Sequence, residues 1–337
     1  MLPGKGITVM KTRVISVCTA LLFLLVPLCV FAKDVISDPV IGSDEVMHLG
    51  HYDSVTNTHT TETVTVSELK AQNEAVKVQR GLSDRDILAG HNPMTGNAVS
   101  MGGGLEPQSL IGDYTQSRVN VGSYPYSAVL LIWASVDKNE DGVVDTWITG
   151  SGFMVGSKVM VTAAHNFFYT CNDGRIVPIT ECRIYPNQAS AAISADRDDY
   201  YHPKSWTYST VYTESGNVEH DWIVVTLFSA LGDTNGFLAV RDPASSLSGV
   251  TATVSGYPAE TPSKRYFQYK STGPLKSYTT KRLFYLMDTE KGNSGGPIFI
   301  LGNQVIGIHT RGSASQNSGT RIFDGLYSII ENRNLAA

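Results

Sequence analysis

Short apolar runs separated by turn residues fill most of the chain after residue 127, and they predict strands rather than helices. Runs of about four to eight β-branched, aromatic or aliphatic residues, bounded by Gly, Pro, Asn, Asp or Ser, are typical of β-strands. The expected strands cover residues 128–136, 143–153, 159–162, 222–227, 250–256, 266–271, 283–287, 298–300 and 305–308. The pattern therefore predicts an all-β core, in which residues 229–236 cross from one half to the other.

Helical periodicity is confined to the two ends of this pattern. Phe323, Leu326, Tyr327 and Ile330 have helical spacing, which predicts a C-terminal helix packed on the β core. Upstream, residues 35–67 are polar and β-leaning, and residues 68–86 are rich in helix formers. Residues 92–104 are rich in Gly, Asn and Met without periodicity, which indicates an exposed, cleavable linker. We expect residues 33–108 to be a propeptide.

The first 32 residues have the pattern of a secretory signal peptide. Lys5, Lys11 and Arg13 precede an apolar run over residues 14–31, and Ala32 offers a cleavage point. The alternative is an uncleaved membrane anchor, but the run is near the lower length limit for spanning a bilayer and contains Pro27. We expect secretion without stable membrane association.

Composition agrees with an exported β protein. The chain has 337 residues, which suggests about two domains. Charged residues make up 17%, below the roughly 25% that is typical, and glycine is frequent with 31 residues, as in loop-rich β proteins. The net charge of −5 gives no support for a nucleic-acid partner, and we expect a monomer.

The cysteines point to an oxidising compartment. Cys18 and Cys29 lie in the expected signal peptide, so only Cys171 and Cys182 remain after its removal. Two cysteines eleven residues apart in an exported protein predict one disulfide. The alternative is a pair of unpaired, buried thiols.

The chemistry centres on the hexapeptide Gly292-Asn293-Ser294-Gly295-Gly296-Pro297. A serine between glycines on a tight turn can expose a nucleophilic hydroxyl, provided that an imidazole accepts its proton and a carboxylate orients that imidazole. Glycines also allow backbone amides to converge without a Cβ in the way. We expect the N–H groups of Gly292 and Ser294 to form an oxyanion hole.

Two upstream residues complete a triad. His165 follows the apolar run that ends in Thr162-Ala163-Ala164. Asp221 directly precedes a second apolar run, residues 222–227. A carboxylate at the start of an apolar run is expected to be partly buried and therefore to need a partner. Three other acids, Asp196, Asp198 and Asp199, lie in a stretch expected to be a polar loop. The order His, Asp, Ser is typical of sites between two packed β-barrels.

These motifs together resemble those of chymotrypsin-fold serine proteases, and more narrowly of the secreted bacterial glutamyl endopeptidases. The resemblance runs from Ser109 to the C-terminus and includes SLIG at 109–112, YPY at 124–126, GYP at 256–258, MDT at 287–289 and GTRI at 319–322. It implies two packed six-stranded antiparallel β-barrels, residues 109–235 and 236–337, the second carrying the C-terminal α-helix. It also implies a serine endopeptidase that needs no cofactor for its chemistry.

The resemblance extends to substrate specificity. Thr289 and His309 stand five residues before and fifteen after the serine, where the family binds the substrate carboxylate. A hydroxyl and an imidazole N–H can stabilise a carboxylate. We expect cleavage of proteins or peptides after Glu, and less readily after Asp. The alternative is a trypsin-like protease cleaving after Lys or Arg, since Asp288 occupies the position where such enzymes hold a carboxylate.

The same resemblance implies that processing creates the substrate pocket. In the family the mature α-amino group lies beside the specificity pocket, and here the mature chain is expected to begin at Ser109. Residues 40–44 also resemble such a start. We expect the N-terminal region to keep the enzyme latent until an activating protease cuts near Ser109.

Two further possibilities remain open. The loop at 137–145 places Asp137, Asn139, Asp141 and Asp145 at positions 1, 3, 5 and 9 of a calcium loop, but Ile148 replaces the glutamate at position 12. The loop is therefore a candidate site for a structural calcium ion, and a solvated turn without a metal is the other interpretation. A non-catalytic binding module on the same fold is also possible, although such relatives usually lack a triad member and this chain has all three.

Overall fold

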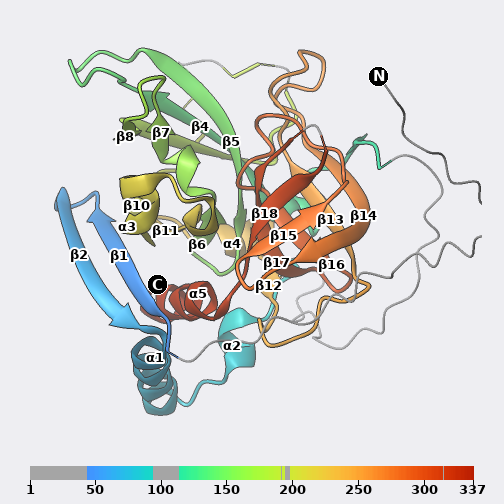
Figure 1. Cartoon of the computed structure of the whole chain (residues 1–337). Helices are drawn as coiled ribbons and strands as arrows, with labels where there is room; N and C mark the ends of the chain where they lie inside the picture. The colour runs from blue at the N-terminus through green and yellow to red at the C-terminus, as the bar shows by residue number, and fades with distance from the viewer. Residues whose placement is uncertain (1–43, 94–113, 191, 194–197, 314) are drawn as a thin grey trace, which may run out of the picture. The chain divides into compact units, whose positions relative to one another are not determined.

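The computed structural model describes residues 44–93, 114–190, 192–193, 198–313 and 315–337 (Figure 1). Within these ranges the protein is mostly β, with two large sheets, one two-stranded sheet and few helices. No helix in the described ranges is long and apolar enough to cross a membrane. The predicted signal peptide and Ser109 lie outside the described residues.

The first sheet surrounds the larger part of the hydrophobic core. Its eight strands follow the spatial order β2 (Thr58–Thr65), β1 (Val46–Asp53), β10 (Pro203–Ser209), β11 (Ile223–Leu227), β6 (Val159–Thr162), β5 (Thr146–Met154), β4 (Val129–Val136) and β9 (Glu181–Pro186). Neighbouring strands are antiparallel. An isolated bridge between Ile184 and Tyr201 links β9 to the residues that lead into β10, so the six strands from β10 to β9 curve back on themselves.

The second sheet closes into a six-stranded antiparallel barrel. Around the barrel the strands are β17 (Gln304–Arg311), β16 (Pro297–Ile300), β13 (Thr251–Gly256), β14 (Tyr269–Tyr278), β15 (Arg282–Tyr285) and β18 (Asn317–Arg321), and β18 pairs again with β17. Two short strands extend it: β12 (Ala239–Val240) runs parallel to β17, and β3 (Ser117–Arg118) pairs with β14. The predicted fold class is confirmed.

The predicted C-terminal helix forms as α5 (Asp324–Ala336). Its apolar side chains, among them Leu326, Ile329 and Ile330, are buried in the same core cluster as strands of the first sheet. Short helices α3 (Thr210–Ser215) and α4 (Leu231–Asn235) and the hairpin of β7 (Phe168–Thr170) and β8 (Ile176–Pro178) complete the part around this sheet.

One buried strand lies where the sequence pattern predicted none. Residues 203–209 form β10 and are followed directly by α3. The strand is rich in hydroxyl residues, yet Thr207, Tyr208 and Ser209 are buried. Strands β11 and β1 pair with its two edges, and Tyr208 packs in a core cluster. The hydroxyl of Ser209 hydrogen-bonds the His220 ring (2.8 Å), so its polarity is satisfied inside the fold.

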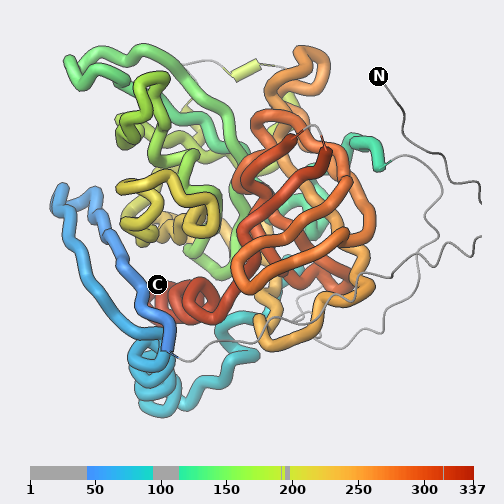
Figure 2. The backbone as a smooth tube through the Cα atoms, in the orientation of Figure 1, coloured from blue at the N-terminus to red at the C-terminus, as the bar shows by residue number. Residues whose placement is uncertain are grey.

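Residues 44–93 form an ordered unit, which we call the N-terminal segment. It consists of the β1–β2 hairpin and helices α1 (Val66–Arg80) and α2 (Asp84–Leu88). Helix α1 begins at a capping box between Thr65 and Glu68 and ends at Gly81, whose φ of +66° favours glycine. Figure 2 shows this segment running beside the C-terminal helix, and α1 packs on α5.

Candidate active site

Strand pairing in the first sheet brings His165 and Asp221 together. His165 lies in a short 3-10 helix (Ala164–Asn166) just after β6, and Asp221 lies just before β11. Because β6 and β11 are antiparallel neighbours, with Thr162 opposite Ile223, the residues beyond these ends meet. His165 Nδ1 is 2.8 Å from Asp221 Oδ2, and the backbone N–H of His165 donates to Asp221 Oδ1 at 3.1 Å.

The Asp221 carboxylate is completely buried, with 0% of its side chain exposed. Burial alone would raise its pKa, but the charge and hydrogen bonds of His165 outweigh that effect and hold the pKa below its usual value. The carboxylate is therefore ionised at neutral pH and keeps the ring proton on Nδ1. This leaves Nε2 of His165 free to accept a proton.

The turn that carries Ser294 is bonded to the first sheet beside His165. The Ser294 carbonyl accepts hydrogen bonds from the backbone N–H of Ser151 (2.8 Å) and from the side chain of Asn166 (2.9 Å), the residue after His165. In the described structure the Ser294 hydroxyl lies 3.4 Å from the Thr310 carbonyl and makes no hydrogen bond to His165. Catalytic hydrogen bonds of this kind often form only in the substrate complex.

The backbone around Ser294 leaves two N–H groups available. The N–H groups of Asn293, Gly295 and Gly296 donate to Glu290, His309 and Asn293 carbonyls, respectively. No acceptor within the described residues bonds the N–H of Gly292 or Ser294. Gly292 has a φ of +97°, and a Cβ there would lie 2.4 Å from a backbone oxygen of the preceding loop. The two N–H groups predicted to form the oxyanion hole are therefore unpaired within the described residues.

His309 is buried beside this turn. Its backbone N–H and C=O bond Gly296 and Gly295, at 2.8 and 2.7 Å. Burial, followed by the electrostatic effects of His165 and Arg282, lowers the pKa of His309 to about 3. The ring is therefore neutral at physiological pH and carries a proton on only one nitrogen.

Tyr285 fixes one side of the His309 ring. Its hydroxyl lies 2.6 Å from His309 Nδ1, and both side chains are buried. The sequence pattern marked residues 283–287 only as an apolar strand. The contact depends on β15, β18 and β17 being adjacent in the closed barrel, which no local pattern reveals.

Arg282 is a second residue that the sequence did not single out. Its guanidinium is buried and donates to the Val218 carbonyl (2.8 Å) and the Thr310 hydroxyl (3.1 Å). It therefore ties the segment before Asp221 to the strand that carries His309. Arg282 follows Lys281 and stands directly before the apolar residues 283–287, so no pattern in the sequence marked it as buried.

The remaining predicted pocket residues lie at the end of β15. Thr289 is partly buried, whereas Asp288 is exposed. The N–H of Asp288 bonds the carbonyl of Tyr114 (2.9 Å) and the hydroxyl of Ser271 (3.0 Å). Residue 114, five positions after Ser109, thus lies against the residue next to Thr289.

The predicted disulfide between Cys171 and Cys182 is wrong for this structure, in which both cysteines are free and buried. Cys171 packs with Val136 and Val177, with its sulfur 3.9 Å from the Lys138 carbonyl. Cys182, on β9, belongs to a different core cluster. Burial raises the pKa of the Cys182 thiol, which disfavours the reactive thiolate.

The oxygen-rich loop at 137–145 satisfies much of its acceptor capacity internally. Asp137 accepts from the N–H groups of Glu140 (2.7 Å) and Gly142 (2.7 Å), and Asp145 accepts from that of Lys138 (2.6 Å). Asn139 and Asp141 bond each other. In the described part of the chain, no group of three or more His, Cys, Asp or Glu residues could hold a metal ion. The calcium site stays a prediction.

Comparison with known proteins identifies relatives of this chain. A family model described as a trypsin-like peptidase domain matches residues 150–308. A glutamyl endopeptidase of Bacillus licheniformis is 29% identical over 242 residues, which cover 67% of this chain and 69% of that protein. A glutamyl endopeptidase of Staphylococcus aureus is 27% identical over 188 residues, which cover 54% of this chain and 46% of that protein.

One further relative and one solved structure also match this chain. A protein called extracellular metalloprotease from Bacillus subtilis is 26% identical, covering 74% of this chain and 76% of its own. A solved structure of a Glu endopeptidase in complex with MPD has a TM-score of 0.54 at 20% identity, and 68% of this chain covers all of it. The structural likeness shows that the two chains share a fold.

Proposed function

Given that the chain is a chymotrypsin-fold serine endopeptidase similar to glutamyl endopeptidases, we propose that it hydrolyses peptide bonds after Glu, and less readily after Asp. The natural substrates are proteins or peptides that contain acidic residues. The names of the relatives support this specificity, and so does the neutral, buried His309 beside the nucleophile turn.

The hydrogen bond between Tyr285 and His309 carries the proposal. A tyrosine hydroxyl that donates to Nδ1 leaves the proton of the neutral ring on Nε2, which then donates to the substrate carboxylate. Thr289 supplies a hydroxyl to the same carboxylate. Because His309 and Tyr285 are buried, their donor geometry exists before the substrate binds, so little reorganisation is needed.

The triad residues have distinct roles in the proposed reaction. Nε2 of His165 takes the Ser294 proton as Oγ attacks the carbonyl carbon, and the tetrahedral oxyanion binds the N–H groups of Gly292 and Ser294. His165 then protonates the leaving amine, which gives an acyl-enzyme. Water, deprotonated by His165, hydrolyses the ester and restores the serine. Asp221 holds the ring in the required tautomer throughout.

We also propose that the protein is exported and made as a zymogen. Cleavage near Ser109 by an activating protease would free an α-amino group close to the substrate pocket. The contact of Tyr114 with Asp288 supports this placement, since it holds the start of the catalytic region beside Thr289. A positive charge there would complement the substrate carboxylate.

A specificity assay tests the function. The processed protein is given matched chromogenic peptides that end in Glu, Gln, Asp, Arg or Phe, with the Ser294→Ala variant as the inactive control. We expect the highest kcat/KM for Glu and no turnover by the variant. Faster cleavage after Arg would refute the pocket assignment and favour Asp288, while failure of a fluorophosphonate to label Ser294 would favour a non-catalytic binding module.

A further inference from the structure

The N-terminal segment contributes to the same hydrophobic core as the catalytic region. Its apolar side chains are almost fully buried: Met47, Leu49, Leu69, Ile87 and Leu88 are each at most 8% exposed. They belong to one cluster with Leu326, Ile329 and Ile330 of α5 and with Val224 of β11. Removal of the segment would expose both faces of this cluster to water.

Polar groups buried in the contact between α1 and α5 are paired across it. Lys77 of α1 and Glu331 of α5 are each 4% exposed, with Lys77 Nζ 2.8 Å from Glu331 Oε1. Asn73, fully buried, donates to the Ser328 carbonyl and to Glu331, both at 2.8 Å. Separation would break these contacts, although Lys77 would keep its pairs with Glu74 and Asp84 of the same segment.

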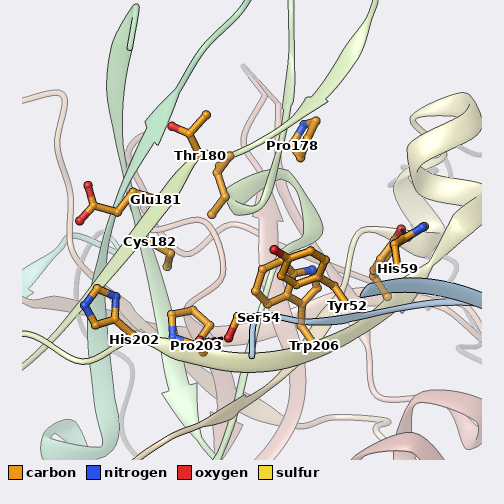
Figure 3. Close-up of a pocket in the computed structure, with 12 residues that line it drawn as sticks. Tyr52, Ser54, His59, Pro178, Thr180, Glu181, Cys182, His202, Pro203 and Trp206 are labelled. Carbon is orange, nitrogen blue, oxygen red and sulfur yellow. Dashed lines mark hydrogen bonds between the residues drawn. The ribbon is translucent and has the colours of Figure 1, made fainter. Parts of the chain in front are cut away.

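The β1–β2 hairpin covers the open edge of the first sheet. Residues Leu49–Asp53 of β1 pair with Ser205–Ser209 of β10, which has β11 on its other edge. Tyr52 stacks on Trp206 with ring centroids 4.3 Å apart, and Figure 3 shows the two rings together in a pocket lined by both parts. At the other end of the segment, His91 exchanges two backbone hydrogen bonds with Phe237.

We propose that residues 44–93 stay bound after cleavage near Ser109, so that the processed enzyme is a non-covalent complex of this segment with the catalytic chain. The complex is held by the shared core, the Lys77–Glu331 pair and the β1–β10 pairing. None of these contacts involves His165, Asp221, Ser294 or His309, so the bound segment leaves the triad uncovered. The inference rests on the proposed cut near Ser109.

The binding test begins with the folded full-length chain. A recognition site that ends at residue 108 is introduced into the Ser294→Ala variant, so that an added specific protease cuts the folded chain directly before Ser109. We expect both fragments to elute together in size-exclusion chromatography and to give their summed mass in native mass spectrometry. Fragments that elute separately in native buffer at micromolar concentration would overturn the proposal.

Matched variants on α1 test whether its buried face holds the segment on the catalytic chain. Leu69→Asp places a charge on the buried face, and Val78→Asp places the same charge at a position that is 79% exposed. We expect Leu69→Asp to weaken retention of the segment at least tenfold and Val78→Asp to leave it unchanged. If Leu69→Asp prevents folding, Asn73→Ala and Lys77→Met replace it. The first removes polar contacts with α5, and the second removes the pair with Glu331 as well as the pairs with Glu74 and Asp84 of the segment. Equal retention in all variants would contradict the proposed surface.

An activity measurement separates this proposal from the proposed function. The same cut is made in the protein with Ser294 intact, and turnover of the Glu peptide is followed beside elution. Retention of the segment without turnover would support the complex and contradict the peptidase assignment. Turnover by a catalytic chain that has lost the segment would leave the peptidase assignment standing and refute the complex.

Discussion

Replacing Tyr285 with phenylalanine removes the hydroxyl that bonds His309 and leaves the apolar ring in place. Nδ1 of His309 then has no partner in a buried site. The ring can move its proton to Nδ1, but Nε2 would then present a lone pair to the substrate carboxylate. Restoring the Nε2–H tautomer leaves Nδ1 unsatisfied, which costs about 1–3 kcal/mol.

That cost predicts a selective loss of activity. At about 1.4 kcal/mol for each tenfold change, kcat/KM for Glu peptides should fall by about 5- to 150-fold. A Gln side chain offers both a donor and an acceptor, so it tolerates either tautomer. The ratio of kcat/KM for Glu to that for Gln should therefore fall in the Tyr285→Phe variant.

The assay compares this ratio in the parent protein, in Tyr285→Phe and in Tyr278→Phe. Tyr278 is a suitable control because it is also buried and lies in the neighbouring strand β14. We expect the control to keep the parent ratio. A Tyr285→Phe enzyme with an unchanged Glu-to-Gln ratio would show that the tyrosine does not set the state of His309, and the reasoning above would be wrong.

Three further predictions concern the triad, pH and the thiols. Asp221→Asn should reduce kcat by about 10⁴-fold, because the amide no longer favours the Nδ1–H tautomer of His165, and a loss under tenfold in peptide assays would contradict this. The pKa of His309 is about 3 in the folded protein and 6.5 in the unfolded chain. As the pH falls below 6.5, the unfolded chain therefore binds a proton that the folded protein does not, and the free energy of unfolding decreases. By pH 5 the loss from this residue should be about 2 kcal/mol, measured by urea unfolding of Ser294→Ala, and it should be absent when His309→Phe is added. Cys171 and Cys182 should not react with Ellman's reagent in the folded protein, and two thiols per processed chain should react after unfolding. If no thiol reacts after unfolding, the two cysteines form a disulfide after all.

The local sequence determined the elements of the catalytic centre. Glycines around Ser294 specify a tight turn whatever surrounds it, and the apolar runs next to His165 and Asp221 specify the strand ends at which both residues stand. Helical spacing near the C-terminus likewise specified α5. Such features depend on residues a few positions apart, which is why they can be recognised before any fold is known.

Tertiary structure alone decided how distant parts meet. The Tyr285–His309 contact needs the closure of the second barrel, and β10 is an interior strand because β1 and β11 pair with both of its edges. The two cysteines are free and belong to different core clusters, although their spacing in the sequence suggested a disulfide. The N-terminal segment has its own helix caps and strand pattern, but its packing on α5 depends on residues some 250 positions away. Contacts at such separations follow from strand register and shared burial, which periodicity within a short window does not encode.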